Sequence, residues 1–165
     1  MTKITILGGT GYAGSALVAE AAKRGLEVTA VSRKAPEQPI EGVHYETGSV
    51  LDPEVLNAAI DGADVIISAL SPRGELTGKQ GAVLAQVAAH ADEHGQRFGV
   101  IGGAGSLLVA PGGPRVIDTP GFPEEIKPEG NELAVVLADL QASPESLDWI
   151  GAFMRPVSRV WFRLA

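Results

Sequence analysis

The sequence contains no cysteine among its 165 residues, which excludes disulfide bonds, thiolate metal sites and cysteine nucleophiles. Aromatic residues make up only 5% of the chain, while glycine occurs 21 times, and this composition suits an α/β protein with many short turns. Lysine and arginine number 13 against 20 acidic residues, for a formal net charge of −7. This charge argues against a surface that binds nucleic acid.

The chain also lacks any apolar run long enough to cross a membrane. It begins directly with an expected strand instead of a signal peptide. His90 and His94 are four residues apart, but they lie at the polar end of an expected helix, so we interpret them as a solvated helix end and expect no metal site. We expect one cytoplasmic domain whose partner is a small-molecule substrate, with no nucleic-acid or membrane partner and a homodimer left open.

A glycine-rich turn near the N-terminus is the most informative feature that is present. Residues 3–14 read KITILGGTGYAG, an apolar β-branched run that breaks into glycines before a helical pattern starts. Gly8 allows a sharp turn, Gly11 leaves room for a pyrophosphate, and Gly14 allows the helix to pack close to the strand. The helix N-terminus then faces the phosphates. A tight turn without a ligand is the alternative, but it does not explain this spacing.

Strands alternate with helices along the rest of the chain. This alternation predicts an α/β Rossmann fold, a doubly wound parallel sheet with helices on both faces and strand order 3-2-1-4-5. Asp52 is expected to cap a helix whose first residue is Pro53. The expected strands are 3–7, 27–32, 43–46, 64–70, 98–101 and 147–150, and the expected helices are 12–25, 53–62, 78–94 and 128–142. Ligands of such folds bind at the carboxyl ends of the strands.

Basic residues follow the second expected strand. A carboxylate at this point selects NAD by binding the ribose hydroxyl, whereas a basic residue accommodates the 2′-phosphate of NADP. The chain has Arg33 and Lys34 there, and the next carboxylate is Glu37. A guanidinium can donate two hydrogen bonds to a phosphate. The sequence therefore predicts NADP(H) as the cofactor in preference to NAD(H), with a merely solvated turn as the alternative.

Several stretches resemble the NAD(P)H-binding atypical short-chain dehydrogenase/reductases, above all the flavin/biliverdin reductase B-like and NmrA-like members. The matching stretches are ILGGTGYAGS, VSRK, GSVLDPEVL, DVIISAL, and VIGGAGSLLVAPG followed by IDTPGFPEEIKPE. The resemblance covers roughly residues 1–149. It implies that the cofactor lies against Gly8, Thr10, Gly11, Tyr12, Ala13, Arg33, Leu51, Asp52, Ala69, Leu70, Ser71, Gly102, Gly103 and Ser106. The glycine motif and the basic pair add Gly14 and Lys34 to the predicted cofactor site.

The chain departs from the short-chain dehydrogenases in lacking their Tyr-x-x-x-Lys pair. Its tyrosines are Tyr12, inside the glycine turn, and Tyr45, which has no lysine four residues on. Ser106 is the best polar candidate for a catalytic role, and its alternative is a serine that caps the turn after the fifth strand. The function expected from the resemblance is reduction of a conjugated acceptor, such as a flavin or quinone, by NADPH. A non-catalytic NADP(H) sensor of the NmrA-like type is the alternative.

The resemblance stops after Trp149, where charge also changes. Residues 150–165 contain three arginines and no acidic residue, so we divide the chain into a Rossmann domain (1–150) and a basic amphipathic segment of the same domain (151–165). We expect a truncated or altered end. Residues 156–164 have the pattern of an amphipathic helix that docks on the open sheet edge. A disordered tail and a membrane-surface helix are the alternatives.

Overall fold

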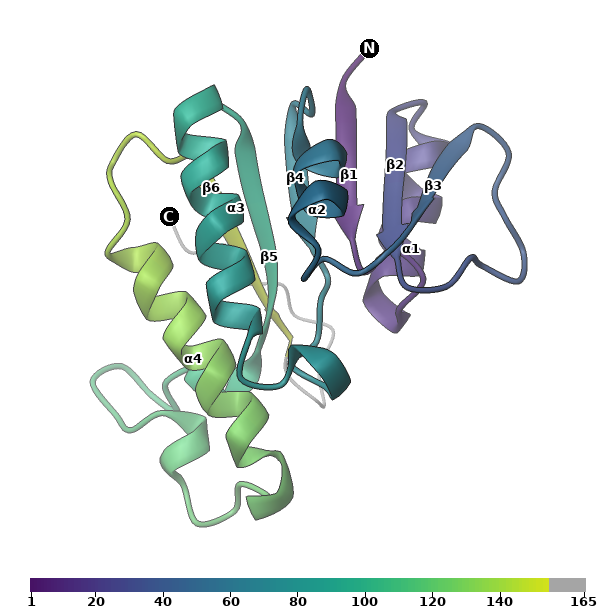
Figure 1. Cartoon of the computed structure of the whole chain (residues 1–165). Helices are drawn as coiled ribbons and strands as arrows, with labels where there is room; N and C mark the ends of the chain where they lie inside the picture. Colours follow the sequence, from purple (N-terminus) through teal and green to yellow (C-terminus); the bar gives the residue numbers. More distant parts are fainter. Residues whose placement is uncertain (155–165) are drawn as a thin grey trace.

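Six parallel strands form one sheet in the order β3-β2-β1-β4-β5-β6 (Figure 1). A computed structural model of the chain describes residues 1–154. Its strands are β1 (Lys3–Leu7), β2 (Glu27–Ser32), β3 (Val43–Thr47), β4 (Val65–Ser68), β5 (Arg97–Gly103) and β6 (Trp149–Met154). Successive strands are added on one side of β1 as far as β3 and on its other side from β4 onward, which is the mark of a doubly wound sheet. The predicted Rossmann fold is confirmed.

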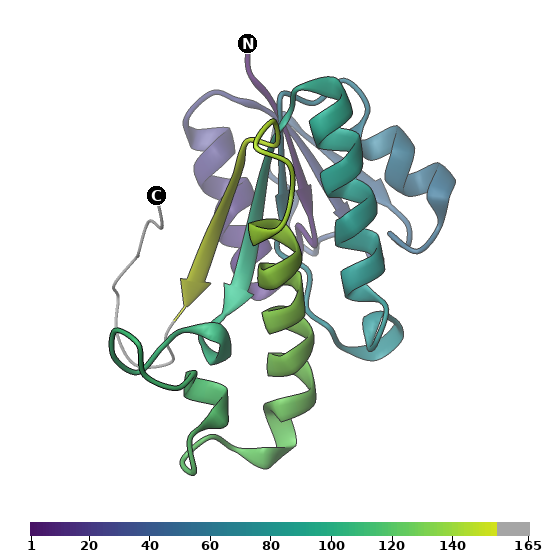
Figure 2. The same cartoon turned by 90° about the vertical axis from the view of Figure 1, so that its left-hand side faces the viewer.

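Helices cover both faces of this sheet. Side chains alternate between the faces of a strand, so Ile6 of β1 faces α1 (Tyr12–Lys23) while Leu7 joins the opposite core. That opposite core is shared with α2 (Pro53–Ile60), α3 (Gln80–His94) and α4 (Lys127–Gln141). Figure 2 shows α3 and α4 together on one side of β5 and β6. The sheet is thus held between two apolar layers.

Local sequence signals set the helix ends. The Asp52 carboxylate accepts a hydrogen bond of 2.9 Å from the Glu54 amide, and Pro53 is the first residue of α2, as the sequence predicts. At the C-terminal end of α3, Gly95 adopts a φ of 65°. This left-handed conformation favours glycine and ends the helix.

The last two strands are longer than the sequence indicates. β5 and β6 pair in register from Phe98 opposite Trp149 to Gly103 opposite Met154, whereas the sequence predicts strands at 98–101 and 147–150. Each strand supplies the hydrogen-bond partners that extend the other. The boundary predicted at residue 150 therefore lies inside β6. By contrast, β4 is shorter than its predicted range of 64–70, because the chain turns away at the cavity described below.

Two predictions concern the C-terminal end of the chain, most of which the structure does not describe. The amphipathic helix expected at 156–164 and most of the basic segment expected at 151–165 lie outside the described residues. Within residues 1–154, no helix combines the length and the apolar character that crossing a bilayer requires.

Candidate functional site

The glycine turn is held tightly against the ends of β2 and β4. The amides of Gly8 and Gly9 both donate to the Val31 carbonyl, at 2.8 and 3.0 Å. Gly8 has a φ of 84°, and a Cβ there would lie 2.9 Å from the Ala69 carbonyl oxygen. Only glycine meets both conditions without strain. The sharp turn out of β1 is therefore set by backbone geometry.

The other two glycines of the turn differ in their surroundings. A Cβ on Gly14 would lie 2.0 Å from the Gly8 carbonyl oxygen, whereas a Cβ on Gly11 would have that oxygen at 3.2 Å as its one close neighbour. Gly14 thus permits the close approach of α1 to β1, as predicted. Gly11 caps α1 without any side-chain hydrogen bond. The first turn of the helix therefore has no side chain competing with an anion for its amides.

A cavity of about 1100 Å³ lies at the carboxyl ends of β1, β2, β4 and β5. The predicted residues that line it are Gly8, Thr10, Gly11, Tyr12, Ala13, Arg33, Lys34, Ala69, Leu70, Ser71, Gly102 and Gly103. They come from four separate segments of the chain, and the parallel sheet brings them together because its strand ends meet at one edge. This is the place where doubly wound folds bind their ligands.

Three of the predicted cofactor-binding residues do not line the cavity. Gly14 acts through packing, and the Asp52 carboxylate is engaged as the cap of α2. Leu51 packs against the core, so its place in the cavity wall is taken by Val50 and Gly48.

Ser106 also lies outside this lining. Its hydroxyl donates to the Gly103 carbonyl at 3.2 Å, which closes the short 3-10 turn of residues 104–106. This hydrogen bond corresponds to the capping role that the sequence left open as the alternative.

Charged residues line the cavity in pairs that the sequence did not indicate. Arg33 and Lys34 are accompanied by Arg73, Glu75 and Glu129. The Nε atom of Arg33 lies 3.9 Å from Oε1 of Glu75. The Nε atom of Arg73 donates to both carboxylate oxygens of Glu129, at 2.8 and 2.9 Å. Three positive against two negative side chains make the lining net positive in a chain whose formal charge is −7.

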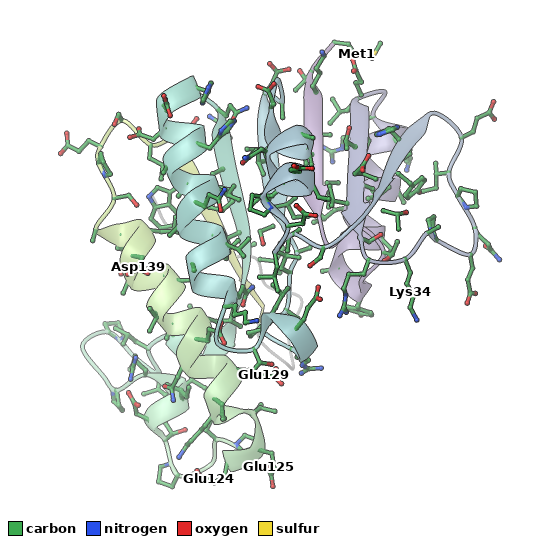
Figure 3. The ribbon with its side chains drawn as sticks, viewed as in Figure 1. Met1, Lys34, Glu124, Glu125, Glu129 and Asp139 are labelled. Atoms are coloured by element: carbon green, nitrogen blue, oxygen red, sulfur yellow. The ribbon has the colours of Figure 1, made fainter. Side chains whose placement is uncertain are left out.

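Figure 3 shows Lys34 and Glu129 at the edge of the sheet toward which the strands run. Lys34 lies on the β2 side of this edge, and Glu129 lies on the α4 side. The charged groups therefore stand around one opening, in an arrangement that suits a ligand with negative charge.

The wall between β4 and α3 is anchored by hydrogen bonds that involve Gln80 and Glu132. Gln80 is fully buried, and its side-chain amide donates to the Leu70 carbonyl at 3.0 Å. Glu132 of α4 accepts from the amides of Gly78 and Gln80, both at 2.9 Å. A carboxylate at a helix N-terminus is stabilised by the helix dipole. These contacts tie α4 to the start of α3 and hold Leu70 in the cavity wall.

The segment IDTPGFP (residues 117–123) packs against the turn that follows β5. Ile117 is buried, and a Cβ on Gly105 would be in contact with its side chain at 3.4 Å. The Arg115 guanidinium donates to the Asp118 carboxylate at 2.8 and 3.1 Å. This hydrogen bond lowers the pKa of Asp118 below its usual 3.8. These contacts support the turn that directly follows Gly102 and Gly103 of β5.

Comparison with known proteins decides the family. Residues 8–156 match the family model described as NAD(P)H-binding. The chain belongs to this NAD(P)H-binding family. The match extends seven residues beyond Trp149, where the resemblance was expected to stop. The described part of this NAD(P)H-binding chain includes no cluster of histidine, cysteine or acidic side chains that could hold a metal ion.

Three solved structures are similar to this NAD(P)H-binding protein. A Bacteroides thetaiotaomicron protein, provisionally named an epimerase, is 31% identical with a TM-score of 0.78; the alignment covers 92% of this chain and 70% of that protein. A Burkholderia pseudomallei protein, provisionally named as exported, is 38% identical with a TM-score of 0.74, over 90% and 70% of the two chains. A Streptococcus pneumoniae protein, provisionally named an NADH-flavin reductase, is 30% identical with a TM-score of 0.69, over 93% and 70%.

The cavity of this NAD(P)H-binding protein fits a dinucleotide on structural grounds. The absence of a side chain at Gly11 and the uncapped start of α1 would allow the pyrophosphate to approach the backbone there. The lining reaches from Arg33 after β2 to Gly103 at the end of β5, so it runs along the carboxyl ends of β2, β1, β4 and β5. Sequence reasoning missed Glu75 and Glu129, and it did not foresee that Arg33 and Arg73 pair with them. No local signal marks them, because each meets its partner across a distance of more than 40 positions in the chain.

Proposed function

We propose that this protein is an NADPH-dependent reductase of a small conjugated acceptor, such as a flavin or a quinone. The observation that carries the proposal is that Arg33 and Lys34 line the same cavity as the glycine turn. A basic residue at the end of β2 accommodates a 2′-phosphate. The choice of NADPH over NADH depends on this pair.

Apolar side chains line the end of the cavity where we expect the acceptor. Leu70, Ile101 and Leu133 line it beside Gly102 and Gly103, and the small glycines leave room for a flat ring. Such walls exclude water from the reacting groups. The provisional name of the Streptococcus pneumoniae relative supports a flavin among the acceptors to be tested.

Hydride transfer is chemistry that bound NADPH itself supplies. With NADPH bound, the acceptor would take up the hydride and one H⁺ from bulk solvent, and the products would be NADP⁺ and the reduced acceptor. The residues of this chain would bind the phosphates, orient the ring against the glycines after β5 and exclude water. This division of labour requires no strong acid or base from the protein.

A non-catalytic NADP(H) sensor is the second candidate. The chain has no Tyr-x-x-x-Lys pair, and the Ser106 hydroxyl donates to the Gly103 carbonyl and lies outside the cavity lining. A protein with this arrangement could bind the nucleotide without turning it over.

The decisive experiment is steady-state NADPH oxidation with a panel of flavins and quinones. Turnover with any acceptor supports the reductase, whereas tight NADPH binding without turnover supports the sensor. Absence of NADPH and NADH binding in calorimetry would overturn both. The proposal includes a cytoplasmic location and a homodimer, which cell fractionation and light scattering after gel filtration test directly.

A further inference from the structure

Glu75 opposes the predicted phosphate-binding arginine from across the cavity. It lies in the short 3-10 turn Gly74–Leu76, which follows β4, whereas Arg33 follows β2. β1 lies between these two strands in the sheet. Oε1 of Glu75 is nevertheless 3.9 Å from Nε of Arg33. The pair therefore spans the row of strand ends over which the glycine turn lies.

The Glu75 carboxylate is held in this position. The Ser49 hydroxyl donates to Oε1 of Glu75 at 2.8 Å and accepts from the Leu51 amide at 3.2 Å. The same carboxylate oxygen thus faces both Ser49 and Arg33. Its side chain is 37% exposed, against 64% for Arg33, so the more buried member of the pair is the acid. Moving the arginine is therefore easier than moving the carboxylate.

A carboxylate in this place has opposite effects on the two nucleotides. It competes with a 2′-phosphate for the Arg33 guanidinium and repels the phosphate charge. It accepts a hydrogen bond from a ribose 2′-hydroxyl, as the acidic residue of NAD-dependent folds does. At the end of β2 the sequence contains basic residues and no carboxylate. The carboxylate of Glu75 comes from the segment after β4, so the sequence around β2 does not reveal it.

We propose that Glu75 is a specificity-determining residue that weakens NADPH binding relative to NADH binding and so moderates the preference set by Arg33 and Lys34. This inference rests on the proposed function, since it requires the adenosine end of the nucleotide to lie beside Arg33. Ser49 is a positioning residue, because it acts on the nucleotide only through the Glu75 carboxylate.

The test compares Glu75→Gln with Glu129→Gln in the full chain. Both variants remove one negative charge from the same cavity, but Glu129 is paired with Arg73 instead of Arg33. Dissociation constants for NADPH and NADH are measured by calorimetry. We expect Glu75→Gln to raise the NADPH affinity about three- to tenfold and to leave the NADH affinity unchanged or lower. Glu129→Gln should change both affinities by a similar factor.

The outcomes distinguish failure of the proposed function from failure of the role of Glu75. If the parent chain binds neither nucleotide, the proposed function fails and this inference falls with it. If the parent chain binds and Glu75→Gln leaves the NADPH to NADH ratio unchanged, only the role of Glu75 is overturned. An equal shift of the ratio in Glu129→Gln would also overturn it, because the effect would then be the net charge of the cavity.

A second variant guards against misfolding of the first. Ser49→Ala leaves the carboxylate charge in place but removes the hydrogen bond that holds it, so the ratio should shift in the same direction by a smaller factor. A shift toward NADH would contradict the proposal. Thermal melting of each variant shows whether the chain is folded.

Discussion

Gly11 and Gly14 belong to the same glycine motif, but we expect their substitution to have opposite effects on nucleotide binding and on stability. Gly11→Val places a branched side chain where the pyrophosphate is expected, while Gly14→Ala places a methyl group inside the packing of α1 against the turn. We expect the first change to abolish nucleotide binding in a folded protein. The second should destabilise the fold.

The magnitudes follow from the surroundings of each position. The backbone of Gly11 has a φ of −73° and a ψ of 173°, an extended conformation that valine readily adopts. Its new Cβ would have one close neighbour, the Gly8 carbonyl oxygen at 3.2 Å. We therefore expect a stability loss of about 1 kcal/mol but a fall in NADPH affinity of at least ~100-fold, on the order of 3 kcal/mol.

At Gly14 the new Cβ would lie 2.0 Å from the Gly8 carbonyl oxygen and 2.8 Å from its carbonyl carbon. Because both are backbone atoms, α1 has to move. Overpacking of this kind costs about 3 kcal/mol, and the better helix propensity of alanine returns about 1 kcal/mol. The net loss of about 2 kcal/mol corresponds to a fall in melting temperature of roughly 4–8 °C.

Calorimetric titration with NADPH and thermal unfolding followed by circular dichroism measure the two effects separately. The parent chain is the reference for both. The reasoning is refuted if Gly11→Val binds NADPH like the parent, or if Gly14→Ala melts at the parent's temperature. A variant pair with these two effects exchanged would mean that the pyrophosphate does not lie at Gly11.

Three further predictions test other parts of the structure. Arg33→Asp should shift the NADPH to NADH preference by roughly 2–4 kcal/mol toward NADH, and an unchanged ratio of dissociation constants would place the 2′-phosphate elsewhere. Hydrogen bonding to Arg115 lowers the pKa of Asp118, so this pair stabilises the fold above the unfolded pKa and loses that effect as pH falls through the folded value. The melting temperature of Asp118→Asn should therefore lie below that of the parent at neutral pH and converge with it in strong acid; a gap that persists there would contradict the assignment. Phe98→Ala should cost about 3–5 kcal/mol in urea unfolding, since Phe98 is fully buried, and a loss below about 1 kcal/mol would show that the core packs differently.

The sequence by itself determined the features that depend on neighbouring residues. The strand, glycine turn and helix of residues 3–23 follow from local periodicity and from the steric freedom of Gly8. The cap of α2 follows from Asp52 and Pro53, which act within one turn of the helix. The strand order came from the alternation of strands and helices, because right-handed crossovers leave few alternatives.

Only the tertiary structure decided which side chains meet. Ser106 was a plausible member of the site by its position, but its hydroxyl finds a backbone acceptor within its own turn. Glu75 and Arg33 are far apart in the chain, and they meet because the segments that follow β4 and β2 approach each other at the carboxyl end of β1, which lies between those strands. The length of β6 depends on its pairing with β5. Such contacts depend on the relative placement of separate elements, and local periodicity carries no information about it.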